Sequence, residues 1–277
     1  MKRPKRPANP SASDRRVGLA RAISKLGYCS RSQAADHVRS GRVTLNGSVT
    51  RNPEAPVRLD KDRIAINGSR LANEQKVYWM MNKPRGVVTT AEDEKGRKTV
   101  YDLLPKGSGS AKSPWIAPVG RLDMASEGLL LFTNDSEWAA RITGPESRLD
   151  KTYHVQINAV AEDAFLSMLE NGIRAKSGEL LRARRATLLR AGEKNSWLAI
   201  VLREGKNRQI RRMLESQNLQ VLRLVRVAIG PLQLGNLPKG AARPLTARER
   251  SSLDQASRAA SVQPQSPAAQ SSSEWDR

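Results

Sequence analysis

Asp123 is the residue of this chain whose surroundings best suit a catalytic group. It ends the segment Gly120-Arg121-Leu122-Asp123, where the leading glycine favours a tight turn. Residues 128–132, GLLLF, are apolar, few and bounded by turn-forming residues, which favours a buried strand over a helix. An aspartate held in front of such a strand can act as a catalytic carboxylate. On these residues alone it can equally cap a backbone N–H group or pair with Arg121.

Other side chains that commonly carry chemistry are scarce. The chain has one cysteine, Cys29, and two histidines, His37 and His154, which lie far apart in the sequence. They show neither zinc-ligand spacing nor a nucleophile-base pattern, and a single cysteine excludes an internal disulfide and fits a reducing compartment. We therefore expect catalysis by carboxylate, phenol, guanidinium and amine groups, without a metal.

The net charge points to a polyanionic partner. The 277 residues carry a formal charge of +21 and a pI near 10.9, well beyond what solubility requires. No apolar run approaches the roughly 20 residues of a membrane-spanning helix, and the N-terminus lacks the apolar core of a signal peptide. We expect a cytoplasmic protein that binds nucleic acid and no membrane.

A second segment with chemical potential is residues 203–214, REGKNRQIRRML. Ile210, Met213 and Leu214 recur at helical spacing, and the main-chain N–H groups at the start of such a helix favour anions. The basic side chains of this segment are Lys206, Arg208, Arg211 and Arg212. Without further information the segment predicts a basic surface helix.

Two other segments must position charged or aromatic groups. Residues 151–157 alternate apolar and polar side chains, which predicts a strand with Tyr153, Val155 and Ile157 on one face. Residues 82–86, NKPRG, predict a turn that carries the charges of Lys83 and Arg85.

Residues 15–70 have the composition of a small separate unit. Two short helices are expected, one ending at Gly27 and the next capped by Ser30, followed by hairpins with Asn-Gly turns. The unit holds 12 Lys or Arg against 4 Asp or Glu, a net charge of +8. Residues 27–31 and 40–47 resemble the alpha-L RNA-binding motif of ribosomal protein S4. That resemblance implies phosphate contacts by Arg31, Arg39 and Arg42.

The chain as a whole predicts an α+β protein of two domains. Sheet and helix segments alternate irregularly after residue 77, which favours a large mixed or antiparallel sheet over a doubly wound one. We expect a small RNA-binding domain at 15–70, a linker at 71–76 and a larger domain at 77–250. The flanking segments 1–14 and 251–277 lack an apolar period and are expected to be disordered.

The order of the motifs resembles pseudouridine synthases that modify bacterial ribosomal RNA, of the RsuA/RluB type. Residues 82–86 have the Lys-Pro-x-Gly form of the family's first motif, and residues 119–135 resemble its catalytic-aspartate motif. Residues 151–153 match the position of the family's base-stacking aromatic residue, and residues 203–214 match a later motif. The resemblance extends over about residues 16–246.

The resemblance implies a larger catalytic domain that isomerises uridine to pseudouridine without a cofactor. Asp123 would be the catalytic carboxylate, Tyr153 would stack on the extruded base, and Arg211 would pair with Asp123, with Arg121 in support. The residues expected to contact RNA are Arg31, Arg39, Arg42, Lys83, Arg85, Lys206, Arg208 and Arg212. The expected partner of this monomer is ribosomal RNA or a pre-ribosomal particle, with large-subunit RNA favoured over small-subunit RNA.

Three mechanistic roles for Asp123 are compatible with the sequence: attack on the sugar, addition to carbon 6 of the base, or removal of a ribose proton. Two other functions also remain open. The chain can be an inactive ribosome-assembly factor with the same fold, or Asp123 and Glu127 can form a carboxylate pair like that of a glycosidase.

Overall fold

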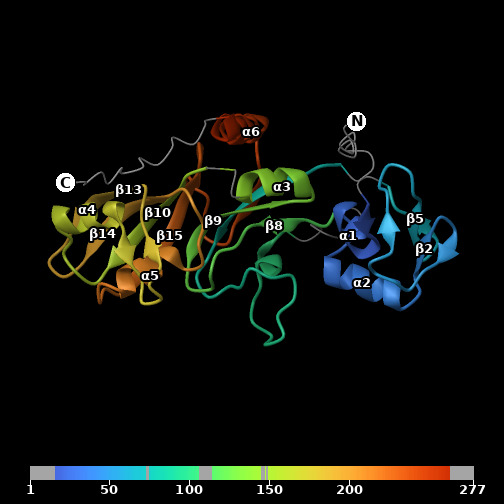
Figure 1. The fold of residues 1–277 in the computed structure, drawn as a ribbon, viewed down its shortest axis with the longest axis horizontal. Helices are drawn as coiled ribbons and strands as arrows, with labels where there is room; N and C mark the ends of the chain where they lie inside the picture. Colours follow the sequence, from blue (N-terminus) through green and yellow to red (C-terminus); the bar gives the residue numbers. More distant parts are fainter. Residues whose placement is uncertain (1–15, 73–74, 106–113, 145–146, 148, 263–277) are drawn as a thin grey trace, which may run out of the picture.

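The computed structural model describes residues 16–72, 75–105, 114–144, 147 and 149–262. The predicted disordered segment 1–14 lies outside these ranges. Two units follow one another along the chain, a small one at one end of Figure 1 and a larger one built on a wide sheet. No helix in the described part of the chain is long and apolar enough to cross a membrane.

The small unit packs two helices against short strands. Ser30 accepts a hydrogen bond from the Gln33 N–H group, and the Gln33 side chain bonds back to the Ser30 N–H group, so the predicted N-cap is a complete capping box. Gly27 adopts φ +79°, as the predicted glycine stop of the first helix requires. The elements are β1 (Val17–Gly18), α1 (Leu19–Lys25), α2 (Arg31–Arg39), β2 (Val43–Leu45), β3 (Ser48–Val49), β4 (Pro56–Val57), β5 (Ile64–Ile66) and β6 (Ser69–Arg70).

The larger unit is organised by a nine-stranded mixed sheet, as expected for this α+β chain. Its main order is β13-β14-β10-β15-β9-β7-β17, with β16 paired to β15 and β8 paired to β9. Neighbouring strands are antiparallel except for β9 and β15, which run parallel at the centre. The strands are β7 (Tyr78–Lys83), β8 (Ala117–Val119), β9 (Glu127–Thr133), β10 (Lys151–Ile157), β13 (Arg185–Ala191), β14 (Ser196–Leu202), β15 (Val221–Ile229), β16 (Leu232–Gln233) and β17 (Ala242–Pro244).

Helices cover both faces of this sheet (Figure 1). α4 and α5 pack with β10, β14 and β15 in one apolar cluster, whereas α3 and α6 share another cluster with β7 and β9. The helices and the separate hairpin are η2 (Val100–Leu103, a 3-10 helix), α3 (Ser136–Thr143), α4 (Asp163–Asn171), β11 (Ile173–Arg174), β12 (Leu180–Leu181), α5 (Gln209–Glu215) and α6 (Ala247–Val262).

β9 is the buried strand predicted behind Asp123. Leu129 and Leu131 enter the cluster with α3 and α6, while Leu130 and Phe132 enter a cluster on the opposite face. Since both faces are covered, the strand is apolar throughout rather than alternating. Asp135 then caps α3 by accepting hydrogen bonds from the main-chain N–H groups of Glu137 and Trp138.

The prediction that residues 251–277 are disordered is wrong for residues 251–262, which belong to α6. Thr246 and Glu249 form a capping box at its start, a Thr-x-x-Glu signal that the low apolar content obscured. Leu253 is fully buried, and Asp254 accepts a hydrogen bond of 2.8 Å from the Trp138 indole. Leu253 and this hydrogen bond, together with the Arg243–Glu249 ion pair and Arg250 over the Tyr78 ring, anchor a helix that has no apolar period. Residues 263–277 lie outside the described ranges.

Candidate active site

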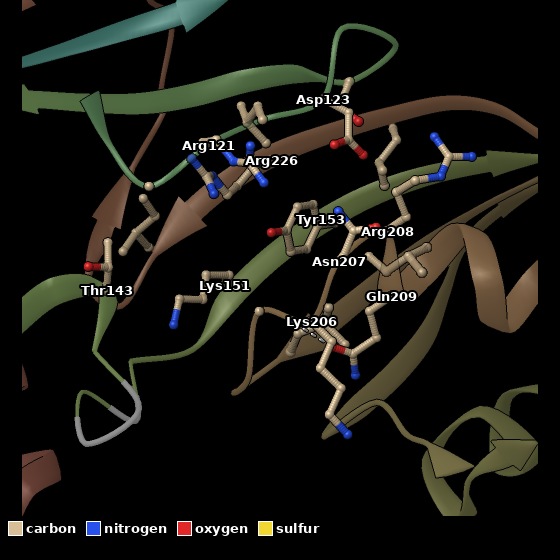
Figure 2. A pocket seen from close by; sticks show the side chains of 18 of the residues that line it. Arg121, Asp123, Thr143, Lys151, Tyr153, Lys206, Asn207, Arg208, Gln209 and Arg226 are labelled. Carbon is tan, nitrogen blue, oxygen red and sulfur yellow. Dashed lines mark hydrogen bonds between the residues drawn. The ribbon is translucent and has the colours of Figure 1, made fainter. Parts of the chain in front are cut away.

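Asp123 and Tyr153 line one pocket of about 280 Å³, although they come from different elements. Asp123 lies in the loop between β8 and β9, and Tyr153 lies on β10. Figure 2 shows Asp123 pointing from its loop toward the pocket, with the Tyr153 ring below it, Arg208 on one side and Arg121 and Arg226 on the other. The pocket therefore combines a carboxylate, an aromatic face and cations, the group types expected from the sequence.

The Asp123 loop is tightly bonded to its own main chain. The Ser126 N–H group donates to the Asp123 carbonyl oxygen at 2.9 Å, and Gly86 N–H donates to the Met124 carbonyl oxygen at 2.8 Å. Gly128, the second residue of β9, has φ +105°, and a Cβ there would collide with the main chain of Arg226 on β15. Only glycine allows β9 to approach β15 this closely, and this approach fixes where the Asp123 loop enters β9.

Lys83 is a buried part of this loop's support, so its predicted contact with RNA is wrong. Its side chain is 0% exposed, and Nζ donates to the carbonyl oxygens of Pro84, Asp123 and Ser126 at 3.1, 3.1 and 2.9 Å. Burial lowers the pKa of Lys83 from 10.5 to about 8, against the opposing attraction of Asp123 and Glu127. Lys83 is the last residue of β7, so its side chain leaves the strand inward, toward the Asp123 loop, and not from the exposed turn.

Arg211 also supports the loop, but through a different contact from the one expected. Its side chain is 9% exposed, and Nη2 donates to the Ala125 carbonyl oxygen at 3.0 Å. The described side chains include no Arg211–Asp123 ion pair within 4.0 Å, so the predicted direct pair is not formed. Burial, followed by Arg208, lowers the pKa of Arg211, while the Asp123 charge opposes this shift. Arg211 therefore holds the main chain of the Asp123 loop by a hydrogen bond and interacts with the Asp123 carboxylate only electrostatically.

Tyr153 lies between the apolar core and the pocket. It is half-buried, lines the pocket and packs against two apolar clusters. Val155 and Ile157, predicted on the same face of β10, are fully buried, so the apolar face continues from the core to the pocket. Arg121 also lines the pocket and is exposed.

Glu127 is not placed to act as a second catalytic carboxylate. It is 4% exposed, and Arg223 and Lys239 approach its oxygens to 3.2 and 2.6 Å. Burial alone would raise the pKa of Glu127, but the hydrogen bonds from Arg223 and Lys239 lower it below the ordinary value. This pairing counts against the glycosidase-like alternative, because hydrolysis needs both carboxylates at the substrate.

The remaining residues expected to contact RNA lie at the surface, and several are already paired. Arg31, Arg39 and Arg42 are exposed on the small unit, and Arg85 is exposed beside the loop. Arg31 approaches Glu54 at 3.4 Å and Arg39 approaches Asp36 at 3.1 Å. The basic side chains around α5 have acidic neighbours on the protein: Lys206 (Glu179 and Glu204), Arg208 (Glu215) and Arg212 (Glu179).

Sequence reasoning missed two cations of the pocket, Lys151 and Arg226. Lys151 precedes Tyr153 by two residues, and the sequence pattern indicated it only as part of the motif at residues 151–153. Arg226 lies on β15 between Val225 and Val227, and it is 7% exposed. An arginine between apolar residues of a strand was an available signal, since arginine is rarely buried without a partner.

Two family models match the chain. The RNA pseudouridylate synthase model covers residues 77–216, and the S4 domain model covers residues 17–64. These matches follow the division of the fold into a large and a small unit.

Relatives with printed functions are similar over most of the chain. A Bacillus subtilis protein named ribosomal large subunit pseudouridine synthase B is 37% identical over 83% of this chain and 93% of its own length. A Haemophilus influenzae protein of the same name is 35% identical over 80% of this chain and 62% of its own length. A crystal structure of a pseudouridylate synthase is 29% identical, with a TM-score of 0.59, over 86% of this chain and 99% of that one.

Proposed function

This chain belongs to the RNA pseudouridylate synthase family, and on that premise we propose that it isomerises a uridine of large-subunit ribosomal RNA with Asp123 as the catalytic carboxylate. The two relatives named above carry the words ribosomal large subunit in their names, which supports this choice of substrate. The S4 domain and the charge of +21 support binding to RNA in general.

The reaction rearranges bonds within one nucleotide. The bond between ribose and nitrogen 1 breaks, the base turns, and carbon 5 joins the ribose; carbon 5 loses a proton and nitrogen 1 gains one. No electrons are transferred to another molecule. The site must therefore supply a carboxylate at the sugar and a surface that holds an extruded base.

The observation that carries the assignment is that Asp123 and Tyr153 line one pocket together with several basic side chains. Asp123 is presented by a loop whose main chain is held by the buried cations Lys83 and Arg211. Tyr153 offers an aromatic face from β10, and stacking on such a face is a common way to hold an unpaired base. Glu127 is engaged elsewhere, so Asp123 is the carboxylate available in this pocket.

The test is pseudouridine formation in unmodified ribosomal RNA, mapped by chemical probing and primer extension. We expect the wild-type protein to modify large-subunit RNA, and Asp123→Asn to abolish the modification while RNA affinity stays within a few-fold, because phosphate contacts supply most of the binding. Asp163→Asn, at an exposed site on α4, is the matched control and should remain active. An active Asp123→Asn protein would end the catalytic assignment, and modification of small-subunit RNA alone would end the substrate assignment.

A further inference from the structure

Arg226 is a buried cation in the candidate active site whose hydrogen bonds are incomplete. It lies on β15, directly opposite Tyr153 on β10 and Gly128 on β9. Its Nε donates to the Leu129 carbonyl oxygen at 2.7 Å. Nη2 is buried and has no hydrogen-bond partner among the described residues. A buried charged donor without an acceptor is costly, so this arrangement favours a ligand that supplies one.

The surroundings of Arg226 are cationic. Lys151 and Arg121 line the same pocket, and Figure 2 shows Arg121 and Arg226 at the end of the pocket away from Arg208. Burial, followed by the charge of Arg226, lowers the pKa of Lys151, which places these two cations within electrostatic reach. The charge of Asp150, the preceding residue in the chain, opposes this shift, but Asp150 already approaches Arg184 at 3.1 Å.

We propose that Arg226 and Lys151, with Arg121 at the rim, form a phosphate subsite that anchors the backbone phosphate next to the target nucleotide. Arg226, Lys151 and Arg121 form no ion pair with a carboxylate among the described residues, although Lys151 Nζ donates to the Arg203 carbonyl oxygen at 3.3 Å. A neutral base carbonyl has no charge to offset these cations, whereas a phosphate has charge and several acceptor oxygens. The identity of the RNA in this proposal rests on the proposed function; the phosphate chemistry does not.

The subsite is tied to Asp123 by the backbone. Gly128 lets β9 approach β15 at Arg226, and the loop carrying Asp123 leads directly into β9. The Arg226 side chain then bonds to the next residue of β9, Leu129. A phosphate held by Arg226 would thus be positioned relative to the carboxylate by paired strands rather than by a mobile loop, which is how a site gains precision.

The first experiment measures RNA binding and steady-state turnover of three variants as a function of salt. Arg226→Gln should raise Kd and KM roughly ten- to hundredfold, the value of one charge-assisted hydrogen bond, and should reduce the salt slope by about one unit. Arg226→Lys should recover part of the affinity. Arg190→Gln, which removes one exposed charge from β13 outside the pocket, should leave both quantities near the wild-type values.

The second experiment changes the RNA and does not depend on the folding of any variant. A methylphosphonate, which is uncharged, replaces the phosphate on the 5′ or the 3′ side of the target uridine in a short RNA. One of these should weaken binding by wild type about as much as Arg226→Gln does, and should weaken the variant no further. A methylphosphonate far from the target is the control.

Two results would overturn the subsite. In one, neither flanking methylphosphonate weakens wild-type binding more than the distant control does. In the other, the flanking methylphosphonate weakens RNA binding by the Arg226→Gln variant as much as it weakens binding by wild type. The two changes would then act independently, and Nη2 would contact a base carbonyl or have a structural role. Failure of the proposed function would look different, because wild type would bind RNA with the same Arg226 dependence and form no pseudouridine.

Discussion

Lys83 allows a direct test of how the Asp123 loop is held. Its fully buried ammonium group has a pKa of about 8, compared with an ordinary value of 10.5. Between these two values, the unfolded chain keeps a proton on Lys83 that the folded chain has released. The free energy of unfolding therefore rises with pH across this window, and the gain is lost again as the pH falls through 8.

We expect Lys83→Met to remove this contribution. With the two pKa values above, the wild-type protein gains about 1 kcal/mol from Lys83 between pH 7 and pH 9. The difference in the free energy of unfolding between wild type and variant should therefore be larger at pH 9 by that amount. Turnover of the wild type should also fall above pH 8. A neutral Lys83 amine donates only two hydrogen bonds, so one of the three carbonyl oxygens that hold the Asp123 loop loses its donor.

The assay is urea denaturation at both pH values, followed by tryptophan fluorescence. Trp79, Trp115, Trp138 and Trp197 lie in the large unit and residues 16–72 contain no tryptophan, so the signal reports mainly on the sheet that holds Lys83. Lys98→Met, at an exposed position, controls for the loss of one positive charge. Equal stability differences at pH 7 and pH 9 would refute the reasoning from burial.

Three other predictions concern the fold and the division of labour. Leu253→Ala should lower the free energy of unfolding by about 2–5 kcal/mol, because Leu253 is the fully buried residue through which α6 packs on the sheet. A loss below about 0.5 kcal/mol in urea denaturation would mean that α6 does not belong to the folded unit. Gly128→Ala should destabilise by more than about 2 kcal/mol and abolish pseudouridine formation, since a Cβ would meet the Arg226 main chain; a stable, active variant would contradict the close strand approach. Deleting residues 1–70 should weaken RNA binding and lower its salt slope while part of the turnover at saturating RNA remains; an unchanged slope would argue against RNA contacts by the S4 domain.

Local patterns in the sequence were enough to predict much of the fold. The apolar run 128–132 predicted the core of β9, the alternation at 151–157 predicted β10, and Ser30 was recognised as a helix cap. These features depend on side chains within a few residues of one another, so the sequence contains the information in one place. The family motifs likewise indicated that Asp123 and Tyr153 belong to one site, and both line the pocket.

The partners of the charged residues were decided by tertiary structure. Lys83 and Arg211 both looked like residues that face RNA or the carboxylate, yet both donate to carbonyl oxygens of the Asp123 loop. Arg226 was hidden in an apolar strand, and only its pairing with β9 and β10 brings it beside Tyr153. The reason is physical: a periodic pattern predicts which way a side chain leaves its own strand or helix. Whether that side chain meets water, a carbonyl oxygen or another charge depends on segments 40 to 140 residues away, and these come together only when the sheet has formed.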